Sequence, residues 1–352
     1  MWINNELFKI SPNEIPKTPI EYSEEARAWW AEHKRRCIEG YSVGGKWMPP
    51  NLYFYINEGV ILLNKTEKSK TKIPAKPFLR DIEWEVFTAW AVARGLSGFI
   101  GHGSLGETSD EILYNIRNNS FSNIKTPIYE NEAKDLMLMG PREFGKSYIA
   151  GIGVILHEWL FDGEKEYIPG KTKEKIIIEG EIESDFSVTN IVVGAGDSSY
   201  AKDLTAKTKL GYDFMAKKGM MFNGKYYPHP FFKKYTGSFN KEVIAKYKKK
   251  IGGNWQDYGS NSKIRVESYK DDPYAGQGTR NSVMVKEEIG MFKGLIKAQE
   301  ADLETMKQGT MKFGFCLYIG TGGAMEGGTL DAYRMFFDPT TYDLLEFEDT
   351  LS

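Results

Sequence analysis

The stretch from Asp135 to Phe161 limits the possible folds of this chain more than any other part of the sequence. It opens with a short apolar run, Leu136–Met139, which is long enough for a buried strand. The segment GPREFGKS follows, and after it apolar side chains recur at helical spacing, at Ile149, Ile152, Ile155, Leu156 and Trp159. The sequence therefore predicts a strand, a glycine-containing loop and a helix in direct succession.

The loop between this strand and helix matches G-x-x-x-x-G-K-[ST], the Walker A pattern of phosphate-binding loops. It comprises Gly140, Pro141, Arg142, Glu143, Phe144, Gly145, Lys146 and Ser147. In such a loop the glycines let backbone N–H groups face phosphate oxygens, close to the positive end of the following helix. Lys146 would reach the β- and γ-phosphates, and the Ser147 hydroxyl is a suitable ligand for Mg²⁺. An ordinary glycine turn is the alternative, but the flanking strand and helix favour a site for ATP and Mg²⁺.

The bulk composition is typical of a soluble globular protein. The chain has 352 residues, of which 41 % are hydrophobic and 27 % are charged. No apolar run approaches the roughly 20 residues that span a bilayer, and the first residues lack the pattern of a secretion signal. With only Cys37 and Cys316, disulfides contribute little, and a reducing cytosol is the expected compartment.

The charge is unevenly distributed along a chain whose net charge is only −2. Residues 201–250 contain thirteen lysines against three acids (Asp203, Asp213 and Glu242), with tyrosine and phenylalanine interleaved. Such a segment is typical of a surface that contacts a polyanion. A solvated face whose lysines are balanced by acids brought close in the fold explains it equally well, and the sequence leaves both interpretations open.

The remaining pattern predicts an α/β protein with two parts. Residues 1–75 form an N-terminal lead-in, with a helix that begins after Ser23 and an aromatic hairpin over Asn51–Leu63 whose turn lies near residues 57–59. Residues 76–352 form the main domain, whose expected elements are a helix over Pro77–Arg94, strands over Lys175–Glu183, Thr189–Gly194 and Ile264–Glu267, and a helix over Ser199–Lys209. Alternating strands and helices around a phosphate loop predict the P-loop NTPase fold, a three-layer sandwich with a mostly parallel central sheet.

A short strand that ends in two acids, Val283–Glu288, is the expected partner of the phosphate loop. In sheets that hydrolyse nucleoside triphosphates the first acid holds Mg²⁺ and the second takes a proton from the attacking water. This assigns Glu287 to the metal and Glu288 to the base, although the usual first acid is the shorter aspartate. Lys286 is unusual in a strand covered on both faces, so we expect it at the strand end with its ammonium in solvent. An exposed acidic strand end is the alternative.

A third motif lies near the end of the chain. Phe315–Ile319 reads as a buried strand, and it is followed by Gly-Thr-Gly-Gly. In such sheets a small polar residue at the tip of the strand beside the phosphate loop can sense the γ-phosphate, and Thr321 fits that role. A simple glycine turn is the alternative.

In this order, the three motifs resemble the ATPase portion of large terminase subunits, the DNA-packaging motors of tailed bacteriophages. GPREFGKS with its internal arginine, VMVKEEIG and YIGTGG carry the resemblance, which spans roughly residues 77–349. A Gly-Thr-Arg loop ahead of the acidic strand and the segment GGTLDAYRMFFDP support it.

The resemblance implies roles for individual residues. Lys146 and Ser147 would bind phosphate and Mg²⁺, and Glu287 would bind the metal. Glu288 would activate water, and Thr321 would couple hydrolysis to movement. Arg142 matches the arginine inside the loop, where it could neutralise charge on the γ-phosphate. Arg280 is a candidate for an arginine finger offered to a neighbouring subunit.

The resemblance also implies partners and a location. The family works as a homo-oligomeric ring, commonly of five subunits, on the portal protein of the procapsid, together with a small terminase subunit and double-stranded DNA in the host cytoplasm. About thirty residues follow Gly323, too few for the nuclease domain of complete terminases. We therefore expect a fragment or split-gene product without DNA cleavage. The alternatives are another P-loop NTPase, such as a helicase-like ATPase or a kinase, and a non-catalytic nucleotide-binding assembly module.

Overall fold

The fold is given by a computed structural model of the chain. It describes residues 24–43, 46–66, 70–94, 122–124, 133–141, 143–161, 189–218, 220–222, 225–227, 229–321, 329–345 and 347–349. No helix among these residues is long and apolar enough to cross a membrane.

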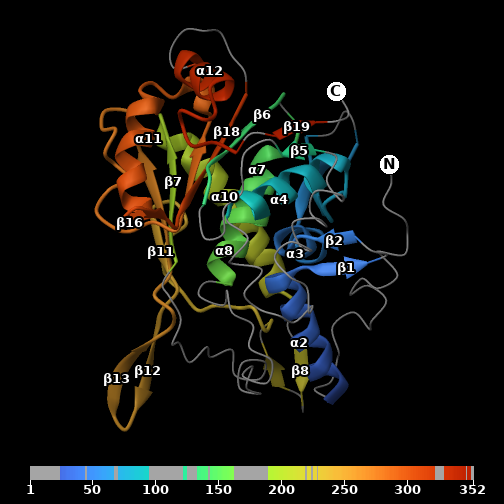
Figure 1. The fold of residues 1–352 in the computed structure, drawn as a ribbon. Coiled ribbons are helices and arrows are strands. Elements are labelled where there is room, and N and C mark those ends of the chain that lie inside the picture. The colour runs from blue at the N-terminus through green and yellow to red at the C-terminus, as the bar shows by residue number, and fades with distance from the viewer. Residues whose placement is uncertain are drawn as a thin grey trace.

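A seven-stranded, mostly parallel sheet lies at the centre of the described chain (Figure 1). Its strands, in spatial order, are β10 (Thr236–Gly237), β11 (Glu242–Ile244), β14 (Lys263–Ser268), β7 (Asn190–Ala195), β15 (Val283–Glu287), β18 (Phe315–Gly320) and β6 (Leu136–Met139). The strands from β14 to β6 pair in parallel, whereas β11 and β10 add an antiparallel margin. The predicted α/β fold with a mostly parallel sheet is confirmed.

Helices cover both faces of this sheet. The first face carries α3 (Pro50–Glu58), α4 (Asp81–Ala93), a continuous helix made of α7 (Lys146–Tyr148), the π-helical η1 (Ile149–Leu156) and α8 (His157–Leu160), and α10 (Ser198–Ala216). The second face carries η2 (Ile289–Met291), α11 (Leu295–Leu303), η3 (Glu304–Met306) and α12 (Thr329–Phe337). The arrangement has three layers.

Successive residues of each parallel strand enter different cores, as the period of a strand requires. In β15, Val283 and Val285 belong to the core on the first face, and Met284 belongs to the core on the second. In β7, Val192 likewise lies on the opposite face from its neighbours. Both faces of the sheet are therefore buried, which explains why these strands read as continuous apolar runs.

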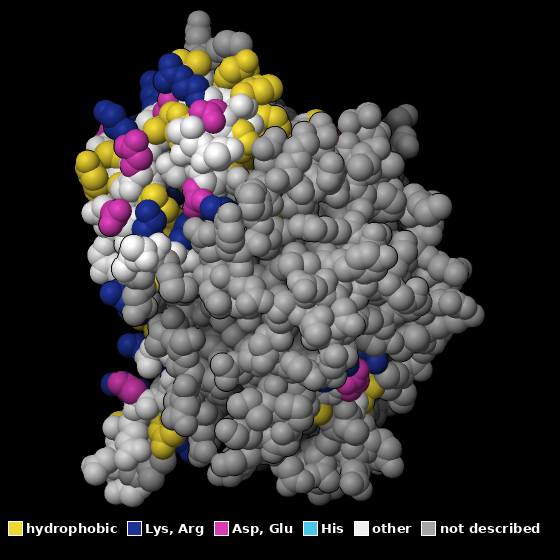
Figure 2. Space-filling model, viewed as in Figure 1, with side chains coloured by type: hydrophobic (Ala, Val, Ile, Leu, Met, Phe, Trp, Pro, Cys, Tyr) yellow, Lys and Arg dark blue, Asp and Glu magenta, His cyan; other side chains and the backbone are white. Residues whose placement is uncertain are grey.

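The other elements are one long helix and several short strand pairs around this body. They are α2 (Glu24–Glu39) and the strand pairs β1 (Tyr41–Val43) with β2 (Lys46–Met48), β3 (Ile61–Asn64) with β4 (Lys72–Ala75), β5 (Ser122–Ile124) with β19 (Phe347–Asp349), β8 (Met220–Phe222) with β9 (Lys225–Tyr227), β12 (Tyr247–Ile251) with β13 (Asn254–Tyr258), and β16 (Lys307–Gln308) with β17 (Met311–Lys312). Figure 2 shows apolar side chains gathered at the top of the molecule, where α12 lies in Figure 1 and exposes Leu330, Tyr333, Phe336 and Phe337.

The predicted hairpin over Asn51–Leu63 is wrong. Its first part is the helix α3, which begins with Pro50 at its first position, where a proline fits because that N–H has no partner within the helix. Its end is β3, which pairs with β4 and not with residues 51–56. Nearly every side chain of α3 is buried, so the aromatic run has no polar face that could reveal a helical period.

Most other predicted elements are confirmed with shifted ends. The helix expected over Pro77–Arg94 is α4, and the one expected over Ser199–Lys209 is the longer α10. The strands expected over Thr189–Gly194 and Ile264–Glu267 are β7 and β14. The strand expected over Lys175–Glu183 and the cap at Ser23 lie outside the described residues.

Candidate functional site

The phosphate-loop segment lies between the carboxyl end of β6 and the helix that begins at Lys146. Gly145 has a left-handed backbone, with φ of 90°, a conformation that glycine adopts without the strain caused by a Cβ. The N–H of Gly140 donates to the carbonyl of Gly320, 3.2 Å away. This bond fastens the start of the loop to the end of the neighbouring strand β18.

The middle of the loop faces outward. Pro141 and Glu143 are exposed, and Phe144 is half-buried. Glu143 also has a left-handed backbone, with φ of 67°. Arg142, which the sequence placed in the site, lies outside the described residues.

Lys146 turns its ammonium back over the loop. Its Nζ donates to the carbonyls of Gly140 and Pro141, both at 2.7 Å. Partial burial lowers the pKa of Lys146, and the negative charges of Glu288 and Glu287 oppose that shift. Both glutamates of the acidic motif are thus within electrostatic reach of the lysine.

The side chains of Ser147 and Glu287 are in contact, although β6, which precedes the loop of Ser147, and β15, which carries Glu287, are not neighbours in the sheet. The hydroxyl Oγ of Ser147 donates a hydrogen bond of 3.1 Å to Oε1 of Glu287. β18 lies between β6 and β15, so this contact spans the tip of the intervening strand. The two motifs therefore form one site at the carboxyl edge of the sheet, where ligands of parallel α/β folds bind.

Side chains along β15 point alternately to the two faces of the sheet, and this decides which of them reaches the loop. Val283 and Val285 lie in the core beside the phosphate-loop helix, and Met284 lies in the opposite core. Glu287 therefore points toward the loop and Lys286 points away from it. A shift of the strand register by one residue would exchange the two.

The surroundings of the Glu287 carboxylate favour binding of a cation. Burial raises the pKa of its carboxyl to about 8, the hydrogen bond from Ser147 and the charge of Lys146 oppose this shift, and the carboxylates of Glu288 and Asp203 add to it. Its Oε2 is buried and has no hydrogen-bond partner among the described residues. A serine hydroxyl beside an unpartnered carboxylate oxygen is a donor set that fits Mg²⁺, which prefers oxygen ligands.

Glu288 and Thr321 lie at two neighbouring strand tips. Glu288 follows β15 directly and has a left-handed backbone, with φ of 51° and ψ of 50°. Thr321 follows Gly320, whose strand pairs with β6. The sequence predicted that Thr321 lies at the tip of the strand beside the phosphate loop, and this placement is confirmed.

Arg80 is a contact of the phosphate loop that the sequence reading missed. Its Nη2 donates to the carbonyl of Phe144 at 3.1 Å, and its guanidinium is also ion-paired with Glu83. The same Nη2 would lie 3.2 Å from a Cβ placed on Gly145. Its only signal in the sequence is its position in the first turn of the helix expected over Pro77–Arg94, which does not show that the helix start faces the loop.

Arg280 lies at the opposite edge of the sheet from the phosphate loop. Its carbonyl accepts a hydrogen bond of 2.8 Å from Nδ2 of Asn190, the first residue of β7. It is exposed and does not belong to the site of its own chain. A role toward a neighbouring subunit stays a prediction.

The expectation that Lys286 reaches solvent is wrong. Lys286 is fully buried and forms an ion pair with Asp302 of α11. Its ammonium lies 3.2 Å from the ring centroid of Tyr269, whose hydroxyl donates to Oδ2 of Asp302 at 3.0 Å. The carboxylate and the ring face replace water around the cation, which is what allows a charge to remain inside a core.

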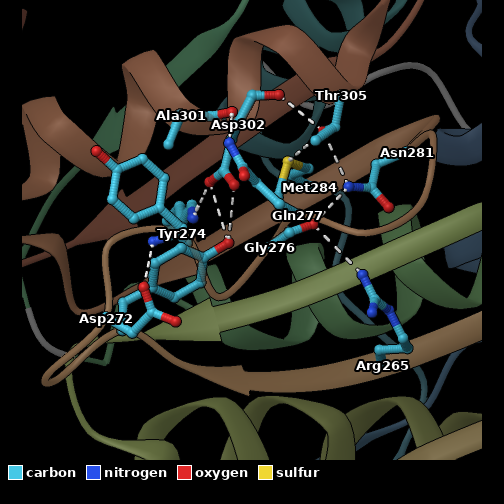
Figure 3. A network of polar contacts seen from close by, with 12 residues as sticks. Arg265, Asp272, Tyr274, Gly276, Gln277, Asn281, Met284, Ala301, Asp302 and Thr305 are labelled. Atoms are coloured by element: carbon cyan, nitrogen blue, oxygen red, sulfur yellow. Dashed lines mark hydrogen bonds and ion pairs between the residues drawn. The ribbon is translucent and has the colours of Figure 1, made fainter.

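This ion pair belongs to a polar network that also holds the loop before β15 (Figure 3). Nδ2 of Asn281 donates to the carbonyl of Gly276 and to Oγ1 of Thr305, at 3.0 and 2.9 Å. A side chain on Gly276 would overlap the side chains of Tyr269 and Asp302. The loop, α11 and β15 therefore pack as one unit on the face opposite the phosphate loop.

The fold and the site together define the class of the protein. A parallel sheet covered on both faces, a phosphate loop leading into a helix, and an acidic strand tip that contacts this loop are the features of the P-loop NTPase fold. The predicted three-layer sandwich is thus confirmed.

Comparison with known proteins gives the following similarities. No protein-family model and no curated protein matches the sequence. Among solved structures, the large terminase ATPase domain of Thermus phage P74-26, unaltered or with one residue replaced, is 13 % identical with a TM-score of 0.32, over 53 % of this chain and 58 % of that chain. The HK97 bacteriophage large terminase is 15 % identical with a TM-score of 0.30, over 60 % of this chain and 34 % of that chain. At these scores the likeness alone defines no activity.

Proposed function

We propose that this chain is the ATP-hydrolysing subunit of a motor that moves double-stranded DNA into a viral procapsid. The observation that carries the ATPase part is the hydrogen bond of 3.1 Å between Ser147 and Glu287, because it joins the phosphate loop to the acidic strand tip. The motor part rests on the order of the three motifs and on their resemblance to large terminase subunits.

In the proposed reaction Lys146 binds the β- and γ-phosphates, and the N–H groups of the loop orient them. Ser147 and Glu287 would hold Mg²⁺, which neutralises charge on the phosphates when bound. Glu288 accepts a proton on its carboxylate from the water whose oxygen attacks the γ-phosphorus, while the β-phosphate oxygen of ADP leaves. Its place directly after Glu287 supports this role, since both carboxylates act on the ammonium of Lys146.

The remaining roles concern coupling and assembly. Thr321, at the tip of β18 beside the loop, would sense loss of the γ-phosphate. Arg142 would stabilise charge on the γ-phosphate from within the loop, and Arg280 would act on a neighbouring subunit. The proposal places the protein in a ring in the host cytoplasm, with the portal protein, the small terminase subunit and DNA as partners.

Phosphate release from ATP, measured with Mg²⁺ and with double-stranded DNA present, tests the enzymatic part. We expect Glu288→Gln to lower the rate by about 10²- to 10⁴-fold while ATP still binds, because only the proton acceptor is lost. Lys146→Ala should abolish hydrolysis through lost phosphate binding. A Glu288→Gln protein that releases phosphate at the wild-type rate would show that another group is the base.

The products of the same reaction separate the alternatives. Free phosphate supports an ATPase, whereas transfer of the γ-phosphoryl group to an added small molecule would indicate a kinase. A wild-type protein that binds ATP but releases no phosphate, even when assembled with portal and DNA, would indicate the non-catalytic module. In that case the longer Glu287 in place of aspartate is the first residue to examine.

A further inference from the structure

The hairpin β12–β13 is a two-stranded ribbon that extends away from the central sheet (Figure 1). Its strands pair in antiparallel register from Tyr247 opposite Tyr258 to Ile251 opposite Asn254. The connecting residues, Gly252 and Gly253, both have positive φ, 57° and 90°, as a tight two-residue turn requires. The ribbon is thus a regular element with a defined register and turn.

The lysines of the segment 201–250 differ in their surroundings. On α10 and after it three lysines are neutralised or buried: Lys209 pairs with Asp213, Lys218 pairs with Glu58 at 2.8 Å, and Lys233 donates to a backbone carbonyl inside the core. Lys202, Lys217, Lys234 and Lys241 are exposed but are spread over separate elements and loops. On the ribbon the exposed positive charge is instead gathered in one short element. Residues 246–258 contain four lysines and one acid, and Lys248, Lys249 and Lys250 are all exposed.

The two faces of the ribbon differ. Directly paired residues share a face, so Lys248 and Lys250 lie on the same side as Trp255, which is 67 % exposed. On the other face the rings of Tyr247 and Tyr258 stack with centroids 5.8 Å apart. The first face therefore presents Lys248 and Lys250 around an aromatic side chain that the protein leaves in solvent, together with one acid, Asp257, which pairs directly with Lys248.

We propose that this ribbon binds B-form double-stranded DNA, with Lys248 and Lys250 on the phosphates and Trp255 directed into the groove. The charge of the ribbon is complementary to the DNA backbone. The major groove of B-form DNA, about 12 Å wide, admits a two-stranded β-ribbon, whereas the deep, narrow major groove of double-stranded RNA does not. The inference deepens the proposed function, because it names the surface that would hold the DNA.

Binding of a labelled DNA duplex of about 30 base pairs, followed by fluorescence anisotropy over a range of salt concentrations, tests the inference. We expect Lys248→Gln/Lys250→Gln to weaken binding at least about tenfold in about 0.1 M salt and to reduce the slope of log K against log salt by about two, since two phosphate contacts are lost. The matched control is Lys217→Gln/Lys241→Gln, which removes two exposed lysines of the same segment outside the ribbon. It should bind like the wild type.

Three results would overturn the inference: no duplex binding by the wild type, equal losses in both double variants, or a loss confined to a single-stranded probe. A variant whose midpoint of thermal unfolding equals that of the wild type is folded. The basal ATPase rate without DNA distinguishes this test from that of the proposed function. Lys248→Gln/Lys250→Gln should keep the basal ATPase rate of the wild type. If this variant hydrolyses ATP and also binds the duplex as tightly as the wild type, only the present inference is refuted and the proposed ATPase function stands.

Discussion

At the scale of single residues, Lys286 connects the candidate site with the opposite face of the sheet. Its backbone precedes Glu287, while its side chain is held by Asp302 and Tyr269. Burial lowers the pKa of Lys286 and raises the pKa of Asp302, and the attraction between the two charges opposes both shifts. The pair is therefore tolerated only as long as both partners are present.

Replacing one partner should be strongly destabilising. We expect Asp302→Asn to lower the free energy of unfolding by about 3–5 kcal/mol, because the buried ammonium loses its counter-charge, and urea titration measures this. Glu300→Gln, at an exposed position of the same helix, is the matched control and should change little. The double variant Lys286→Met/Asp302→Leu should recover most of the loss. A decrease below about 0.5 kcal/mol for Asp302→Asn would contradict this view of the pair.

At this scale the sequence predicts what is local. The loop residues Lys146 and Ser147 and the acids after β15 could be located because their spacing is dictated by one strand and one turn. The environment of Lys286 could not, since its counter-ion is sixteen residues away on a helix that packs from the second face. Arg80 was missed for the same reason, because its loop partner Phe144 is 64 residues away.

At the scale of elements, the helix after the phosphate loop is fitted closely between its neighbours. Its middle part, η1, is wound as a π-helix, and two of its glycines lie at close contacts. A Cβ on Gly151 would lie 3.1 Å from the carbonyl oxygen of Leu204 in α10. A Cβ on Gly153 would overlap the ring of Phe87 in α4. Both positions therefore require the absence of a side chain.

Gly153→Ala tests this packing, because close packing and loose packing predict opposite changes in the free energy of unfolding. Alanine is favoured over glycine in a helix by about 1 kcal/mol, so a loosely packed helix would become more stable. We expect the opposite, a loss of about 1–3 kcal/mol in the free energy of unfolding, because Phe87 must move. Phe87→Leu combined with Gly153→Ala should cost less than the sum of the single changes. A stabilised Gly153→Ala protein would show that the close contact is absent.

His157, at the start of α8, connects this helix to α2. Its Nε2 donates to the carbonyl of Cys37 at 2.7 Å, and its ring is buried. Burial lowers the pKa of His157 to about 4, which the charge of Glu158 and the bond to Cys37 oppose only in part. The folded protein therefore keeps this side chain neutral at pH values where an unfolded chain protonates it.

This shift predicts a loss of stability in mild acid. As the pH falls from about 6.5 to about 4, the unfolded state takes up the proton first, and His157 should remove about 3 kcal/mol from the free energy of unfolding. His157→Gln keeps a hydrogen-bond donor but does not titrate, so its urea-unfolding free energy should fall less over the same range. At pH 8 the group contributes no pH dependence to either protein. Parallel curves for both proteins between pH 7 and pH 4 would contradict the assignment.

The segment whose secondary structure the sequence mispredicted is buried on nearly every side. The segment Pro50–Glu58 is rich in aromatic residues, which favours a strand by propensity, but tertiary packing places it in a helix among the other helices of the first face. By contrast, α10 has the expected pattern because it follows a cap signal, Asp197, whose side chain accepts a hydrogen bond from the N–H of Ser199. Propensity is the weaker guide where every neighbour is apolar.

At the scale of the whole molecule, the order of strands matters most for the site. The sequence predicts a mostly parallel sheet with the strand before Thr321 beside the phosphate loop, but it does not show that β15 lies on the far side of β18 from β6. That order is set by which faces the crossover helices cover, and it places three motifs at adjoining strand tips. The lead-in also contributes to the core on the first face, through residues such as Trp30 and Leu52. The boundary near residue 75 stays a prediction.

The central claim is that Ser147 and Glu287 together hold the Mg²⁺ of bound ATP. Titration calorimetry of ATP binding with and without Mg²⁺, at a pH above the pKa of about 8 of Glu287, tests it most directly. We predict that Mg²⁺ tightens ATP binding to the wild type by at least about tenfold and that Glu287→Gln removes this gain while still binding ATP alone. An unchanged effect of Mg²⁺ in Glu287→Gln, or no ATP binding by the wild type, would contradict the account.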